Sequence, residues 1–135
     1  MKSLSILLID DDELERIKFK KVCKDICFSC TIVEAVDGKQ ALHFLSAKGK
    51  TFDIIILDLH MPKMNGLELL RILKSNTEYK NIPVVIMSNS EDSTELQDCY
   101  NLGISGYFTK PAQYSQYSEK VKSLLDYWKR NELNE

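Results

Sequence analysis

Acidic side chains gather directly behind the first apolar run of the sequence, in the stretch SILLIDDDELE. The apolar residues Ile6–Ile9 run straight into Asp10, Asp11 and Asp12. Adjacent carboxylates repel one another, and burying one of them without a partner is costly. The stretch therefore indicates that something neutralises these aspartates, or that at least one of them has a separate role.

Polar residues follow three further strand-like runs in the same way: Asp58, Ser88 and Lys110 stand at these ends. The runs are Ile54–Leu57, Val84–Met87 and the weaker Ser105–Thr109. In an open α/β sheet, residues after the strands meet in the crevice beyond the carboxyl ends. Carboxylates suit a hard divalent cation, and an ammonium and a hydroxyl suit a phosphoryl group. The pattern predicts a site for Mg²⁺, with Mn²⁺ as a substitute.

Capping offers a simpler explanation for two of these residues. Asp12, with Glu15 three residues later, matches a capping box, and we expect Asp12 to cap the first helix. Ser88, with Glu91 three residues later, has the same spacing, so both interpretations stay open for it.

Strand patterns alternate with helix patterns along the whole chain. Near-continuous apolar runs indicate strands covered on both faces, and apolar residues three and four apart indicate helices. The expected strands are Ile6–Ile9, Cys30–Val36, Ile54–Leu57, Val84–Met87 and Ser105–Thr109. The expected helices are Glu13 to about Cys27, Lys39 to about Lys48, Gly66 to about Ser75, Glu91 to about Leu102 and Gln113 to about Arg130. The predicted fold class is α/β: a doubly wound five-stranded parallel sheet, (βα)5 and flavodoxin-like, in strand order 2-1-3-4-5.

Composition indicates one globular domain over residues 1–135 with no output domain, since 44% of the residues are hydrophobic and 28% charged. The formal net charge of -2 argues against direct binding of nucleic acid or of an anionic membrane. We expect a cytoplasmic protein, because neither a signal peptide nor a membrane-spanning run is apparent.

Three cysteines, Cys23, Cys27 and Cys30, have the spacing C-x3-C-x2-C, which also occurs in enzymes that bind an iron–sulfur cluster and S-adenosylmethionine. Phe19, Val22, Cys23 and Ile26 instead recur on one face of a helix. The favoured interpretation is reduced thiols in the core.

With these features the sequence resembles a receiver domain of the two-component response-regulator family, of the stand-alone, chemotaxis-regulator kind. The resemblance covers nearly the whole chain and rests on LLIDDD, DIIILDLHMPKMNGLELL, PVVIMSNS and GISGYFTKP. The second motif is the most specific, because Asp58 is followed by Met61–Pro62 and Asn65–Gly66 in order.

The resemblance implies a role for each site residue. Asp10 and Asp11 would be the acidic pair for Mg²⁺, and the backbone carbonyl of His60 a further metal ligand. Asp58 would be both a metal ligand and the phospho-acceptor. Ser88 would contact the phosphoryl group, Lys110 would sense it, and Tyr107 would be the aromatic switch. It also implies a cis bond between Lys110 and Pro111.

The implied function is that of a signalling phospho-acceptor which catalyses only its own phosphorylation and dephosphorylation. A histidine kinase or histidine phosphotransfer protein donates the phosphoryl group to Asp58. Ser88 is then drawn toward the phosphoryl group, and Tyr107 turns inward into the space that Ser88 leaves. The face of the fourth helix, fifth strand and fifth helix changes as a result, and an unknown downstream protein binds to it. Docking to that protein and onward relay of the phosphoryl group both stay open.

Two departures from the family pattern lead to further hypotheses. Asn89 replaces a smaller residue at the mouth of the site, and the side chain of His60 either lies near the same mouth or is exposed with only its carbonyl in use, which is the favoured interpretation. We predict that His60, Asn89 and Ser90 tune the lifetime of the phosphorylated form. The apolar stripe of the last helix extends to Trp128, which either packs on the sheet or contacts a second subunit in a homodimer. The stripe consists of Tyr114, Tyr117, Val121, Leu124, Leu125 and Trp128.

Three other functions compete with this one. A haloacid-dehalogenase-like phosphatase needs a second aspartate where this chain has His60. A flavodoxin-like electron carrier needs a phosphate-binding loop where this chain has Asp10–Asp12. A phosphorylation-independent receiver-like adaptor is disfavoured by the intact set of site residues.

Overall fold

Strands and helices alternate in the computed structural model, which describes residues 3–26, 29–47, 49, 51–61, 64–89 and 92–130. The strands are β1 (Leu4–Ile9), β2 (Cys30–Ala35), β3 (Ile54–Leu57), β4 (Val84–Ser88) and β5 (Gly106–Thr109). The helices are α1 (Glu13–Asp25), α2 (Gly38–Ser46), α3 (Gly66–Ser75), α4 (Ser93–Asn101) and α5 (Tyr114–Arg130).

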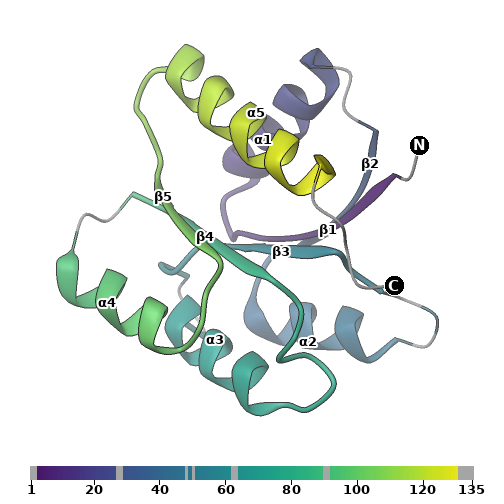
Figure 1. Ribbon diagram of the computed structural model, residues 1–135, viewed down its shortest axis with the longest axis vertical. Helices are drawn as coiled ribbons and strands as arrows, with labels where there is room; N and C mark the ends of the chain where they lie inside the picture. The colour runs from purple at the N-terminus through teal and green to yellow at the C-terminus, as the bar shows by residue number, and fades with distance from the viewer. Residues whose placement is uncertain are drawn as a thin grey trace.

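The strands form one parallel sheet in the order β2-β1-β3-β4-β5 (Figure 1). The chain runs outward from β1 to β2 and then returns to β3 on the other side of β1, so the order reverses between β1 and β3. In the register of the sheet, Ile9 lies opposite Leu57, and Leu57 lies opposite Ile86. The central strands therefore end at nearly the same level. The predicted fold class and strand order are confirmed.

Helices cover both faces of the sheet, with α1 and α5 on one side and α2, α3 and α4 on the other (Figure 1). Along β3, Ile54 and Ile56 pack toward α1 and α5, while Ile55 and Leu57 pack toward the other three helices. Both faces of the central strands are apolar for this reason. None of the helices in the described part of the chain has both the length and the apolar character that a bilayer span requires.

Element boundaries differ from the predicted ones by a few residues, most clearly at α4. This helix begins at Ser93 and not at Glu91, because Asp92 caps it: its Oδ1 atom accepts a hydrogen bond from the backbone N–H of Thr94 at 2.8 Å. The cap for α4 is thus supplied by Asp92, and the capping interpretation of Ser88 is wrong.

The apolar stripe of α5 packs within its own chain. Trp128 is only 8% exposed and lies in the core cluster that α1 and α5 form with the sheet. The packing interpretation of Trp128 is therefore confirmed, and the homodimer stays a prediction. Tyr114, assigned to the same stripe, is 37% exposed and donates a hydrogen bond from its hydroxyl to Asp25 of α1 at 3.1 Å.

Cys23 is a free thiol buried in the same cluster, and Cys30 is a half-buried free thiol packed against it. The interpretation as core thiols is confirmed for both, because they fill apolar space beside the sheet. Cys27 lies outside the described residues.

Candidate functional site

The polar residues that follow the strands are held at one edge of the sheet by backbone hydrogen bonds. The N–H of Asp58 donates to the carbonyl of Ile9 at 2.9 Å, which fixes Asp58 beside the end of β1. The N–H of Lys110 donates to the carbonyl of Ser88 at 2.8 Å, which fixes Lys110 beside the end of β4. The sheet thus brings together residues that are far apart in the sequence.

Three carboxylates form an acidic cluster at this edge. Carboxylate oxygens of Asp10, Asp11 and Asp58 lie within 4.8 Å of one another; Asp10 is buried, Asp58 is half-buried and Asp11 is exposed. Negative charges this close repel unless a cation lies between them, and hard divalent cations prefer oxygen ligands. The donor set therefore fits a cation such as Mg²⁺.

Lys110 provides a positive charge inside this cluster. Its Nζ atom lies 2.9 Å from Oδ2 of Asp10, and the side chains of the two residues are only 5% and 6% exposed. Burial lowers the pKa of the Lys110 ammonium, but Asp10, Asp58 and Glu15 together outweigh burial, so its pKa is raised above the ordinary value. Lys110 is therefore a permanent cation beside the carboxylates.

The carboxylate of Asp58 is less acidic than an ordinary aspartate. Burial raises its pKa to about 6; Lys110 opposes the rise, and the negative charge of Asp10 adds to it. The backbone N–H of His60 donates to Oδ1 of Asp58 at 3.3 Å and also favours the charged form. Without a bound cation, the protonated and the ionised forms of Asp58 are therefore close in free energy near pH 6.

Gly66 fixes the loop after β3. Its N–H donates to the carbonyl of Leu59 at 2.7 Å, and a Cβ atom at this position would lie 2.5 Å from the carbonyl oxygen of Asp58. Only a glycine permits the start of α3 to approach the Asp58 backbone this closely. The side chain of the preceding residue, Asn65, caps α3 through the N–H of Glu68 at 2.9 Å.

Ser88 and Tyr107 contact each other behind the cluster. Ser88 is fully buried at the end of β4, and Tyr107 is half-buried on β5. Burial raises the pKa of Tyr107, although a hydrogen bond with Ser88 opposes the rise. The predicted hydroxyl and the predicted aromatic switch residue are thus in direct contact in this structure.

The side chain of His60 extends away from the cluster toward α4. It is 55% exposed, and its Nε2 atom lies 3.2 Å from Oε2 of Glu95. Sequence reasoning missed Glu95, although its place in the first turn after the β4 loop puts it at the edge of the site. Asn89 is exposed next to Ser88. Ser90 and Pro62 lie outside the described residues.

Asp12 caps α1 as predicted, because its Oδ1 atom accepts from the N–H of Leu14 at 2.9 Å. In a capping box the side chain of Glu15 would accept a hydrogen bond from the backbone N–H of Asp12. That N–H instead donates to Oδ1 of Asp10 at 3.0 Å, so the capping-box role of Glu15 is wrong. Glu15 faces two ammonium groups instead: its Oε2 atom lies 3.5 Å from Nζ of Lys18 and 3.8 Å from Nζ of Lys110.

The expected cis bond between Lys110 and Pro111 is also wrong. No peptide bond among the described residues is cis. The trans form is the intrinsically preferred isomer of such bonds.

The sequence profile of the response regulator receiver domain matches residues 6–122 of this chain. The chain belongs to the response regulator receiver domain family. Receiver domains are the phosphorylation-accepting signalling modules of two-component systems, and they do not form an ordinary enzyme family. Chemotaxis protein CheY-3 of Vibrio cholerae is 30% identical over 93% of this chain and 94% of its own length. Two-component response regulator ORR5 of Oryza sativa is 34% identical over 89% of this chain and 87% of its own length.

Solved structures agree with this assignment. The phosphorylated cyanobacterial phytochrome response regulator RcpA has a TM-score of 0.92 at 28% identity and covers 99% of this chain and 100% of that one. The Mn²⁺-bound form of response regulator Rcp1 has a TM-score of 0.89 at 27% identity and covers 98% of this chain and 99% of that one. The phosphatase, electron-carrier and phosphorylation-independent alternatives are not favoured for a receiver domain with this site.

Proposed function

We propose that this receiver domain accepts a phosphoryl group on Asp58 from a phosphohistidine of a histidine kinase or a histidine phosphotransfer protein. A carboxylate oxygen of Asp58 forms a bond to phosphorus while the phosphorus–nitrogen bond of the donor breaks, and the electron pair of that bond stays with the imidazole. The product is an acyl phosphate. The observation that carries the proposal is that the half-buried Asp58 lies in one cluster with Asp11 and with Asp10, which pairs with the buried Lys110.

Each remaining site residue has a role in this reaction. Lys110 compensates negative charge at the transferred group, and the hydroxyl of Ser88 donates to one of its oxygens. Mg²⁺, or Mn²⁺ as a substitute, would be held by the carboxylates of Asp10, Asp11 and Asp58 and by the carbonyl of His60. When bound, the cation supplies charge neutralisation for the carboxylates and the phosphoryl oxygens. The domain catalyses only its own phosphorylation and dephosphorylation.

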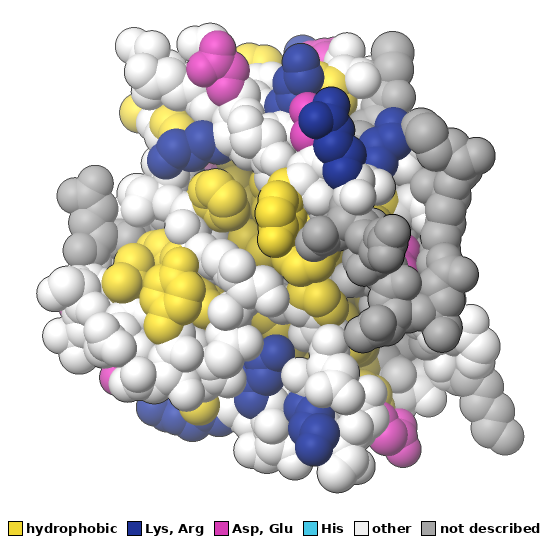
Figure 2. All heavy atoms as spheres, in the orientation of Figure 1, with side chains coloured by type: hydrophobic (Ala, Val, Ile, Leu, Met, Phe, Trp, Pro, Cys, Tyr) yellow, Lys and Arg dark blue, Asp and Glu magenta, His cyan; other side chains and the backbone are white. Residues whose placement is uncertain are grey.

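The output of the reaction is a change on the face formed by α4, β5 and α5. Apolar side chains gather there over α4 and beside β5 and α5 (Figure 2). On α4, Leu96 is 37% exposed and Tyr100 is 47% exposed. Tyr107, on β5 of this face, is hydrogen-bonded to Ser88, so movement of Ser88 toward a phosphoryl group changes the surroundings of Tyr107.

A separate protein then reads this face or takes the phosphoryl group onward. We propose a cytoplasmic receiver module, in line with CheY-3, which this chain matches over 94% of that protein's length. Neither nucleic acid nor a membrane is a direct partner, in keeping with the net charge of -2.

Incubation with Mg²⁺ and acetyl phosphate tests the proposal. Intact-protein mass spectrometry should show one added phosphoryl group, and Asp58→Asn should abolish it. Asp126→Asn, on α5, is the matched control and should be phosphorylated like the wild type. No modification of the wild type, or a modification that Asp58→Asn retains, would refute the assignment of Asp58. Beryllofluoride, a phosphoryl mimic, should bind the wild type and not Asp58→Asn.

A further inference from the structure

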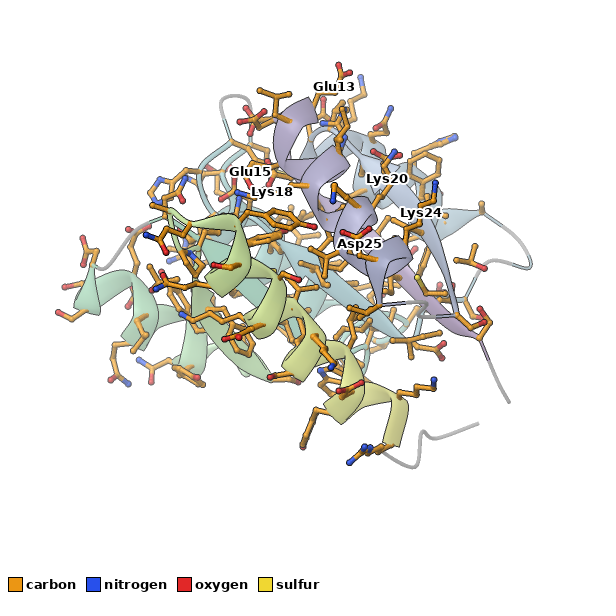
Figure 3. All side chains as sticks on the ribbon, turned by 90° about the horizontal axis from the view of Figure 1, so that it is seen from above. Glu13, Glu15, Lys18, Lys20, Lys24 and Asp25 are labelled. Carbon is orange, nitrogen blue, oxygen red and sulfur yellow. The ribbon has the colours of Figure 1, made fainter. Side chains whose placement is uncertain are left out.

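Glu15, in the first turn of α1, is a half-buried carboxylate that the proposed reaction does not use. Among the described residues its Oε2 atom is buried and accepts no hydrogen bond. Nζ of Lys18 lies 3.5 Å from that atom and Nζ of Lys110 lies 3.8 Å from it. In Figure 3, Glu15 and Lys18 lie together on the side of α1 that faces the start of α5, whereas Lys20 and Lys24 lie on the other side.

Lys110 therefore has two carboxylate neighbours. Asp10 lies 2.9 Å from its ammonium and accepts a hydrogen bond, and Glu15 lies 3.8 Å away without one. At equal dielectric, Coulomb's law gives Glu15 roughly three quarters of the attraction of Asp10 at these distances. The described residues Asp58 and Lys110 do not form an ion pair of this kind with each other, whereas Lys110 pairs with both Asp10 and Glu15. The ammonium is thus held on the side of Asp10 and Glu15.

The space between these groups has little room for water. Asp10, Glu15, Asp58 and Lys110 line one hollow of about 10 Å³, together with the apolar side chains around Phe19. Such a volume is at the lower limit for a single water molecule. Charges across it are screened much less than charges on the surface.

We infer that Glu15 is a positioning residue for Lys110: it holds the ammonium next to Asp10 and opposes its movement to a phosphoryl group on Asp58. The inference rests on the proposed function. A phosphoryl oxygen on Asp58 competes with Glu15 for the same ammonium, so the charge of Glu15 disfavours the phosphorylated form and shortens its lifetime.

Four proteins test this: the wild type, Glu15→Gln, Glu15→Asp and Glu13→Gln. Glu15→Gln removes the charge at nearly constant size, and Glu15→Asp keeps the charge on a shorter side chain. Glu13→Gln makes the same charge change at an exposed position of the same helical turn. Each protein is phosphorylated with acetyl phosphate and Mg²⁺, the acetyl phosphate is removed, and the decay of the phosphorylated form is followed. Urea unfolding of each variant establishes the folded fraction to which the rates are normalised.

We expect Glu15→Gln to lengthen the lifetime by about threefold or more, as for directly coupled charges, while Glu15→Asp and Glu13→Gln stay within about twofold of the wild type. The side-chain ammonium NMR signal of Lys110 in the unphosphorylated protein should shift in Glu15→Gln and not in Glu13→Gln. If Glu15→Gln matches the wild type and Glu15→Asp does not, Glu15 acts through packing and the inference is wrong. Equal lifetimes for Glu15→Gln and Glu13→Gln, or an unmoved Lys110 signal, also overturn it. A wild type that takes no phosphoryl group refutes the proposed function instead.

Discussion

Replacing Asp58 by asparagine should stabilise the fold in the absence of Mg²⁺. Burial raises the pKa of this carboxyl from 3.8 to about 6, so the folded chain binds the proton more tightly than the unfolded chain does. Loss of the proton therefore disfavours the folded state. The destabilisation is absent below the unfolded value of 3.8, grows as the pH rises, and is complete above about pH 6.

The size of the effect follows from the same two values. A rise from 3.8 to about 6 corresponds to about 3 kcal/mol for a fully buried group. Asp58 is only half-buried, and solvent screens part of this, so we expect about 1–2 kcal/mol. Asparagine keeps the shape of the side chain and the acceptor for the N–H of His60, so little else changes.

Urea unfolding with EDTA present measures the difference. Asp58→Asn should raise the free energy of unfolding by about 1–2 kcal/mol near pH 8, and by only a few tenths near pH 4. Glu119→Gln, an exposed carboxylate on α5, should change it by less than about 0.5 kcal/mol at both pH values. Added Mg²⁺ should narrow the gap between the wild type and Asp58→Asn. An unchanged stability near pH 8, or an equal gain at both pH values, would show that the surroundings of Asp58 do not disfavour its charge.

Three other predictions concern the residues around the site. Gly66→Ala should lower the free energy of unfolding by about 1–3 kcal/mol, because the new methyl group meets the Asp58 backbone. Gly106→Ala is the control, since the nearest atom to a Cβ at that position would be 3.6 Å away. Equal losses of stability in the two variants would contradict the close approach of Gly66 to Asp58. Tyr107→Phe should cost about 0.5–1.5 kcal/mol in urea unfolding through loss of the hydrogen bond to Ser88, and an unchanged stability would contradict that bond. His60→Ala and Asn89→Ala should change the dephosphorylation rate measured after removal of acetyl phosphate, and the tuning hypothesis fails if neither does.

The positions of the strands could be predicted because central strands of a parallel sheet are apolar on both faces. Ile54–Leu57 is an uninterrupted apolar run, and the structure forms β3 from the same four residues. The site residues could be predicted for a related reason: each follows a strand, and parallel strands end at one edge. The end of an apolar run marks the end of a strand, so the sequence alone indicates which residues lie at that edge.

The pairing of charged side chains could not be predicted in the same way. Glu15 has the spacing of a capping box, yet it faces Lys18 and Lys110, because the fold brings α1 next to the end of β5. The contact of His60 with Glu95 likewise depends on where α4 begins. Such pairs are decided by rotamers and by neighbours distant in sequence, and local patterns carry little information on either.

The ion pair between Asp10 and Lys110 also bears on the local stability of the sheet. Lys110 follows the edge strand β5, whereas Asp10 follows β1, and β3 and β4 lie between these strands. The edge strand is thus held by its ladder with β4 and by a charge contact that reaches past two strands. Because regions with fewer stabilising contacts open more easily, we expect hydrogen exchange in β5 to become faster when Lys110 leaves Asp10. Movement of the Lys110 ammonium away from Asp10 should therefore increase the frequency with which the edge strand β5 opens.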